Sequence, residues 1–98
     1  MASKRTQASR DAVDWVLGHL PNQSRFTTHE AHAMGDALMS QAWPRHLKGA
    51  WRRVSTRVDD LGNFLGRHPL FEKHPDGVYR SERRGVRVRT QQWRRKSN

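Results

Sequence analysis

The segment that most constrains the fold of this chain is residues 46–61, HLKGAWRRVSTRVDDL. Its apolar residues recur every three or four positions, a spacing that places side chains on one face of an α-helix. The stripe comprises Leu47, Ala50, Trp51, Val54, Val58 and Leu61. A helix with so wide an apolar face packs against other elements, so the sequence predicts one helix over 44–61 that covers a core.

The remaining faces of this predicted helix are basic. They carry five cations with no acidic residue before Asp59: Arg45, Lys48, Arg52, Arg53 and Arg57. Residues 11–79 as a whole are neutral, whereas residues 1–10 carry a charge of +3 and residues 80–98 carry +7, which together give the net charge of +10. A neutral body with cations concentrated on one element and at both ends is typical of a protein with a polyanionic partner.

A first helix is predicted upstream, over residues 9–20. Ser9 is a suitable N-cap, and the apolar residues that follow it recur on one helical face. Pro21 cannot continue a helical hydrogen-bond ladder, so we expect the helix to end there.

A second helix has the clearest start signal in the chain, the sequence FTTHEA. It fits a capping box, in which the Thr27 side chain accepts from the amide of Glu30 and the Glu30 side chain accepts from the amide of Thr27. This helix is expected to end near Ser40. Pro44 then suits the first turn of the helix over 44–61.

The sequence Pro75-Asp76-Gly77 lies between two short β-prone runs and predicts the turn of a β-hairpin. Beyond the hairpin, residues 82–98 are basic and contain few apolar residues. We interpret them as a mobile or loosely docked arm. Trp93 within this arm either docks back onto the domain or stacks on a partner.

The order of these elements resembles the winged helix-turn-helix superfamily of DNA-binding domains. The resemblance covers residues 9–81 and is carried by FTTHEA, by HLKGAWRRVSTRVDDLG and by LFEKHPDGVYR as the wing. It implies a small α+β fold of three helices followed by a hairpin wing, with basic flexible ends at 1–8 and 82–98. It also implies that the helix over 44–61 enters the major groove of DNA while the wing contacts the backbone or minor groove.

The residues expected at this interface carry cations or hydroxyl groups. Guanidinium and ammonium groups contact phosphates and guanine edges, and hydroxyl groups contact phosphates or thymine methyl groups. The helix supplies Arg45, Lys48, Arg52, Arg53, Ser55, Thr56 and Arg57. The wing supplies Lys73 and His74, and the C-terminal arm supplies Arg83, Arg84, Arg87 and Arg89. Because Asp59 and Asp60 repel phosphate, we expect the contact to fade before them.

Three functions remain open at this stage. The first is binding of double-stranded DNA as a transcriptional regulator or as a nucleoid or phage-type accessory factor. The second is association with RNA or the ribosome through the same basic surface. The third is docking on an acidic partner protein. The oligomeric state is equally open between a monomer and an array assembled on DNA.

Several classes of protein are not expected from this sequence. It contains no cysteine, which excludes disulfides and thiolate metal sites and favours a cytoplasmic location. Together with the resemblance to DNA-binding domains, this implies a nucleoid-associated protein. It has no apolar run of membrane-spanning length. His29 and His32 do not have the spacing of a zinc-protease motif, and no set of nucleophile, base and acid stands out. We therefore expect no metal, no cofactor and no enzymatic activity.

Overall fold

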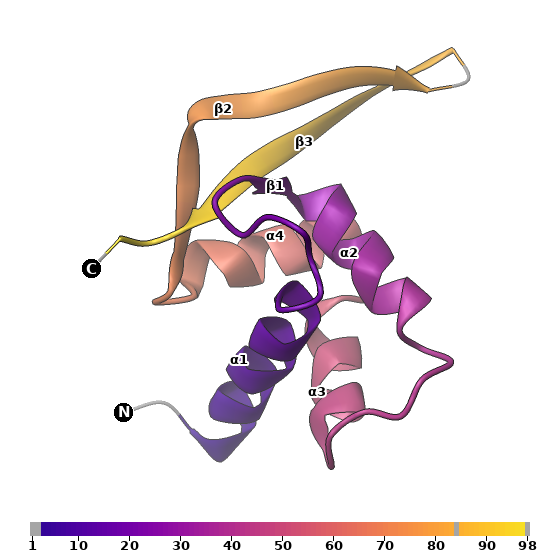
Figure 1. The fold of residues 1–98 in the computed structure, drawn as a ribbon, viewed down its shortest axis with the longest axis vertical. Helices are drawn as coiled ribbons and strands as arrows, with labels where there is room; N and C mark the ends of the chain where they lie inside the picture. The colour runs from indigo at the N-terminus through magenta and orange to yellow at the C-terminus, as the bar shows by residue number, and fades with distance from the viewer. Residues whose placement is uncertain (1–2, 84, 98) are drawn as a thin grey trace.

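The helices pack beneath one antiparallel sheet in the computed structural model, which describes residues 3–83 and 85–97 (Figure 1). Together these elements form an α+β domain. Their order is α1 (Lys4–Leu17), β1 (Phe26–Thr27), α2 (Thr28–Ala37), α3 (Leu47–Val54), α4 (Val58–Arg67), β2 (Phe71–Arg83) and β3 (Val86–Arg95).

Helix α1 begins earlier than the sequence predicts. The side chain of Ser3 accepts a hydrogen bond from the Thr6 amide at 3.1 Å and caps the helix. Ser9, the expected cap, is instead 4 % exposed within the helix, and Ala8 beside it packs against the core. The expected N-terminal arm over 1–8 is therefore wrong for the residues that α1 contains.

The capping box of α2 is confirmed. Thr27 Oγ1 accepts from the Glu30 amide at 3.0 Å, and Glu30 Oε1 accepts from the Thr27 amide at 3.2 Å. The helix ends at Ala37, slightly before the predicted position near Ser40. The box also fixes where strand β1 ends, because Thr27 belongs to both features.

The single helix predicted over 44–61 is wrong, since two helices, α3 and α4, occupy this region and extend beyond it. The hydroxyl group of Ser55 donates to the carbonyl of Trp51 at 2.7 Å, and that of Thr56 donates to the carbonyl of Arg52 at 3.1 Å. Such side-chain bonds compete with the helical ladder. Arg57 is then extended, with φ −128° and ψ 157°, and begins a new helix that continues to Arg67.

The hairpin turn predicted at Pro75-Asp76-Gly77 is also misplaced. Strand β2 pairs with β3 on both sides of this sequence, with a shift of register between Lys73 and Val78. The Pro-Asp-Gly sequence bends the chain within β2, and Gly77 adopts the positive φ of 73° that this bend requires. The hairpin instead reverses between Arg83 and Val86.

Strand β3 lies in the centre of the sheet, whose order is β1-β3-β2. On one side, Phe26 and Thr27 of β1 pair with Trp93 and Gln92 of β3. On the other side, β2 pairs with β3 along most of its length. The expectation of a mobile arm over 82–98 is therefore wrong for the strand, and Trp93 is a core residue with 2 % exposure. Beyond the reach of β1, the hairpin continues as a two-stranded extension, here called the β-ribbon (residues 78–83 and 86–91).

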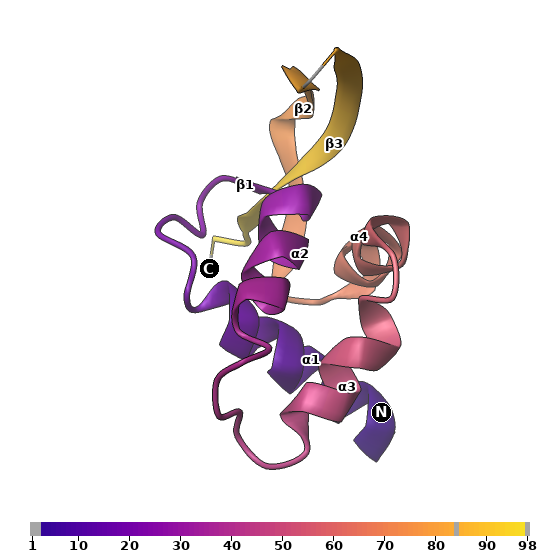
Figure 2. The same cartoon turned by 90° about the vertical axis from the view of Figure 1, so that its right-hand side faces the viewer.

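The core lies between the helices and the inner face of the sheet. Trp51 of α3 is 1 % exposed, and Leu61 and Leu65 of α4 are fully buried. Figure 2 shows the β-ribbon, α4 and α3 following one another from top to bottom along one side of the molecule. This arrangement places the two halves of the predicted basic helix on the same side as the hairpin.

Candidate nucleic-acid interface

Two arginines oppose each other directly across the β-ribbon. Arg80 of β2 pairs with Arg89 of β3, and directly opposed residues of an antiparallel pair project from the same face. Both are exposed, and neither makes an ion pair within the described residues. Like charges in this arrangement destabilise a hairpin. A bound anion would relieve the repulsion, so this pair is a candidate anion-binding site.

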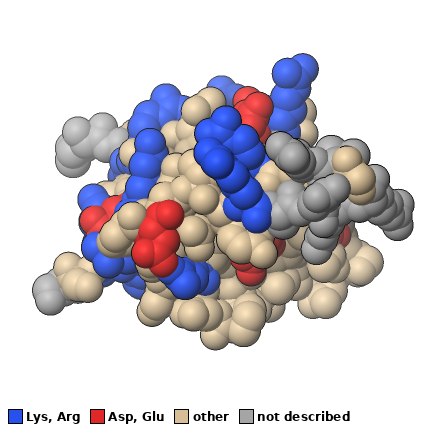
Figure 3. Space-filling model, turned by 90° about the horizontal axis from the view of Figure 1, so that it is seen from above, with Lys and Arg blue, Asp and Glu red and all other residues tan. Residues whose placement is uncertain are grey.

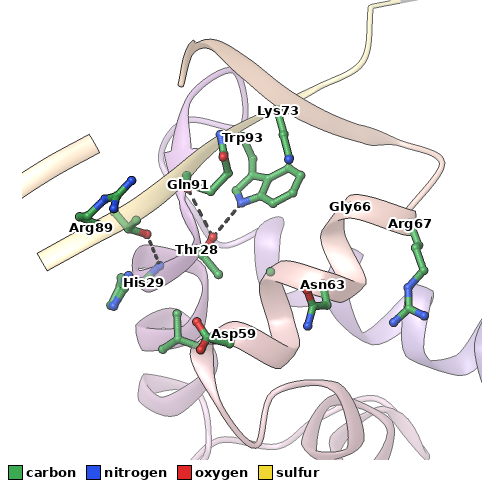
Figure 4. Close-up of a pocket in the computed structure, with 13 residues that line it drawn as sticks. Thr28, His29, Asp59, Asn63, Gly66, Arg67, Lys73, Arg89, Gln91 and Trp93 are labelled. Atoms are coloured by element: carbon green, nitrogen blue, oxygen red, sulfur yellow. Dashed lines mark hydrogen bonds between the residues drawn. The ribbon is translucent and has the colours of Figure 1, made fainter. Parts of the chain in front are cut away.

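An open groove of about 890 Å³ begins beside this arginine pair and runs between α4 and the sheet (Figure 4). One wall is α4, with Val58, Asp59, Gly62, Asn63, Gly66 and Arg67. The other wall is the sheet, with Lys73, Arg89, Thr90, Gln91 and Trp93. Thr28 and His29, at the start of α2, lie between the two walls.

The bottom of the groove is held together by hydrogen bonds between α2 and β3. The Trp93 indole N–H donates to Thr28 Oγ1 at 2.8 Å, and this hydroxyl donates to the carbonyl of Gln91 at 3.3 Å. The His29 amide donates to Thr90 Oγ1 at 3.3 Å. The sheet wall is therefore fixed relative to α2, which suits a surface that has to present side chains in a defined geometry.

Cations predominate along the groove. Arg67, Lys73 and Arg89 line it, and Asp59 is the one acidic residue among the described residues that do so. Figure 3 views the molecule from the side of the sheet and shows Lys and Arg side chains over the middle and upper part of this face, while the lower part is largely uncharged. The charge is thus concentrated rather than evenly spread.

The basic cluster predicted from the sequence is divided between α3 and its neighbours. Arg52 and Arg53 are exposed in the last turn of α3, and Arg57 is exposed between α3 and α4. Arg45 is exposed in the connector before α3. Lys48 differs from these, because its ammonium group donates to the carbonyl of Met39 at 2.7 Å and so holds the connector against α3.

The two hydroxyl residues predicted to contact DNA both form hydrogen bonds within the fold, and only Ser55 is buried. Ser55 is 9 % exposed, its hydroxyl group bonds to Trp51, and its carbonyl lies 2.8 Å from His32 Nε2. Thr56 is exposed, but its hydroxyl group donates to the carbonyl of Arg52. The expectation that Ser55 faces DNA is therefore wrong.

His74 does not lie at the tip of a wing. It sits in the bend of β2 with a side chain only 16 % exposed, and its Nδ1 accepts from the Asp76 amide at 3.1 Å. Burial, followed by the positive charges of Arg25 and Arg94, lowers the pKa of His74 below its ordinary value. Because the predicted phosphate contact relies on a protonated imidazole, this shift makes the contact less favourable, and the contact stays a prediction. Lys73 beside it is exposed and lines the groove.

The residues predicted in the C-terminal arm have different outcomes. Arg89 lies in the groove, as described above. Arg84 lies outside the described residues. Arg83 and Arg87 belong to the backbone of the β-ribbon, but their side chains fall outside the part of the molecule that the structure describes.

Comparison of the chain with protein-family models, with curated proteins and with solved structures found no match. Over the described ranges, no helix is long and apolar enough to cross a membrane. The same residues contain no cluster of three side chains that would hold a metal ion.

Sequence reasoning missed three residues that the groove and the β-ribbon bring together. A turn at Pro75-Asp76-Gly77, as the sequence predicts it, conceals the pairing of Arg80 with Arg89. A helix that ends at residue 61 likewise leaves out Asn63 and Arg67, which belong to α4. The signal that would have found the arginine is the alternation of Val86 to Thr90, which is typical of a strand and requires a pairing partner.

Proposed function

We propose that this protein binds double-stranded DNA through the surface formed by the β-ribbon, α4 and α3. The observation that carries the proposal is the cross-strand couple of Arg80 and Arg89, which makes no ion pair among the described side chains, beside a groove lined by Arg67 and Lys73. These cations have no acidic partner among the described residues. Cations concentrated on one surface, with no acidic partner in the described part of the chain, are suited to phosphate contacts.

The shape of this surface favours duplex DNA. The major groove of B-form DNA is about 12 Å wide and admits either an α-helix or a two-stranded ribbon. Helix α4 and the β-ribbon stand side by side here, so a helix can enter the groove while the ribbon follows a phosphate backbone. The major groove of A-form RNA is too narrow for such an element.

The arrangement supports a winged helix-turn-helix domain as the finer description of the fold. The order of elements is that of the superfamily that the sequence resembles, except that two helices replace the one predicted over 44–61. The chain runs through α2, a connector, α3 and α4 and then a long hairpin. In this proposal the helix that precedes the hairpin, α4, takes the place assigned to residues 44–61. The contact then continues past Asp59 and Asp60, where the sequence predicts that it fades. The biological role that fits is a DNA-binding regulator or an architectural factor.

The experiment is fluorescence anisotropy with a labelled random duplex of about 25 base pairs, titrated at several salt concentrations. We expect binding that weakens steeply with salt. The double variant Arg80→Ala/Arg89→Ala should lower the slope of log K against log salt by about 1.8, since each phosphate contact contributes about 0.9. The circular dichroism spectrum should be unchanged, because the substitutions remove two side chains that repel each other.

The matched control is Lys4→Ala/Arg5→Ala, which removes the same charge from the exposed start of α1. In Figure 1 this end of α1 lies at the opposite end of the molecule from the β-ribbon. We expect the control to bind nearly as the wild type does. Equal losses in the two variants, absence of duplex binding, or a preference for structured RNA in competition would each refute the proposal.

A further inference from the structure

Helix α4 presents a ridge of three polar side chains to the groove. Asp59, Asn63 and Arg67 follow one another at intervals of four residues, so they share one face of the helix. All three are exposed, and the buried residues Leu61 and Leu65 lie on the opposite face. At about 1.5 Å per residue the ridge extends about 12 Å, comparable with about three base-pair steps.

These three side chains have no hydrogen bond or ion pair within the described residues, so none is engaged in holding the fold. Their neighbour Asp60 contrasts with them, because its carboxylate accepts from the Arg57 amide at 3.2 Å and caps α4. The helix dipole favours Asp59 at the start and Arg67 at the end of α4. It offers nothing to Asn63, which is a poor helix former in the middle of the helix.

The residue types along the ridge match the chemistry of base edges in the major groove. An aspartate accepts from the amino group of cytosine, an asparagine bonds to adenine through two hydrogen bonds, and an arginine does the same with guanine. Asp59 is the informative member, since a carboxylate on a phosphate-binding surface is repulsive unless it accepts from a base. We infer that Asp59, Asn63 and Arg67 recognise bases, so that DNA binding by this protein is sequence-specific; this inference rests on the proposed function.

Two glycines give this ridge clearance on its sheet side. A Cβ atom at Gly62 would lie 3.6 Å from Thr28 Cγ2, and one at Gly66 would lie 3.8 Å from Trp93 Cη2. Both are ordinary contacts, so packing does not require glycine at either position. Each glycine nevertheless weakens the helix by about 1 kcal/mol relative to alanine. In this inference both positions lack a side chain because the edge of a base pair needs space beside the ridge.

The test is selection of bound sequences from a random duplex pool by the full chain and by three single variants. Asn63→Ala should lose the preference for adenine at one position of the motif. Asp59→Asn should lose cytosine at another, and Arg67→Lys should lose guanine while it keeps the charge. Each loss should reduce discrimination at that position by about fivefold to a hundredfold.

The matched control is Asp36→Asn, which removes an exposed acid from α2 and should leave the motif unchanged. A motif that all three α4 variants retain, or duplex binding without any motif, would overturn this inference and leave the proposed function standing. A motif that changes in Arg52→Ala/Arg53→Ala instead would place recognition on α3 and also overturn it. Absence of duplex binding would refute both proposals.

Discussion

The indole ring of Trp51 occupies the space beside Gly35 that a side chain at that position would need. A Cβ atom added at Gly35 would lie 2.5 Å from Trp51 Nε1 and closer still to two carbon atoms of the ring. Trp51 is 1 % exposed and is among the largest buried side chains of the core. The indole ring of Trp51 therefore lies closer to the backbone of α2 than any side chain at position 35 would allow.

Gly35→Ala should destabilise the protein. The added methyl group has to displace a buried indole ring that is enclosed on all sides, and overpacking of this kind costs about 1–3 kcal/mol. Urea unfolding followed by tryptophan fluorescence measures the free energy of unfolding. An unchanged midpoint would show that the indole ring can move aside at little cost.

Gly66→Ala is the matched substitution in α4 and should have the opposite sign. The new Cβ would lie 3.8 Å from Trp93 Cη2, which is an ordinary contact. Alanine is favoured over glycine in a helix interior by up to about 1 kcal/mol. Gly66 lies in the last turn of α4, where the gain is smaller, so the urea midpoint should rise slightly. A fall in the midpoint would mean that α4 packs more tightly against the sheet than the structure shows.

The features that the sequence predicts correctly are local ones. The capping box depends on two residues three positions apart, Thr27 and Glu30, whose chemistry is visible without knowledge of the fold. The burial of Trp51 follows from its place in an apolar stripe. Both depend on neighbours along the chain, so periodicity and capping rules suffice for them.

The break between α3 and α4 escapes such rules for a physical reason. Val58 and Leu61 continue the apolar spacing of α3, so the stripe passes through the break without a signal. The hydroxyl groups of Ser55 and Thr56 favour the break, because they bond to carbonyls one turn back and compete with the helical ladder. Hydroxyl residues make such bonds in many intact helices as well. The helix ends here because Asp60 also caps a new helix that begins directly afterwards.

The position of β3 escapes prediction because its partners are distant in sequence. The Trp93 indole N–H bonds to Thr28, which is more than sixty residues earlier in the chain. Arg89 pairs with Arg80 of β2, and the turn predicted at Pro75-Asp76-Gly77 conceals this pairing. Residues 82–98 also contain too few apolar residues to indicate that this segment is buried. The sequence therefore predicts that the candidate site is basic, but it does not predict all of the residues that form the site.

Removal of residues 86–98 should prevent folding. The deletion removes the central strand, leaves β1 and β2 without a partner, and exposes the core where Trp93 is buried. Circular dichroism and the loss of a cooperative urea transition would record the effect. Removal of residues 97–98 alone is the control, because it retains the bond from the Lys96 amide to the Leu70 carbonyl at 2.9 Å. A folded, cooperative 1–85 fragment would contradict the role assigned to β3.

His74→Asn should lessen the loss of stability on acidification. Burial, followed by the charges of Arg25 and Arg94, lowers the pKa of His74 below 6.5 in the folded protein. The unfolded chain therefore binds more protons as the pH falls below about 6.5, so the histidine makes the free energy of unfolding decrease there. Asparagine removes this titration and keeps an acceptor for the Asp76 amide. Urea unfolding at about pH 7.5 and about pH 5.5 should show a smaller difference in the variant than in the wild type.

Arg52→Ala/Arg53→Ala separates phosphate contact from base recognition. Both side chains are exposed in the last turn of α3, a helix that follows α4 and the β-ribbon along one side of the molecule in Figure 2. If they contact phosphates, their loss should weaken binding to all duplex sequences alike and lower the salt slope by up to about 1.8. Anisotropy titrations against the selected motif and a scrambled duplex measure both quantities. Weakened binding to the motif alone would instead make these arginines part of the recognition surface, and unchanged binding to both would exclude α3 from the interface.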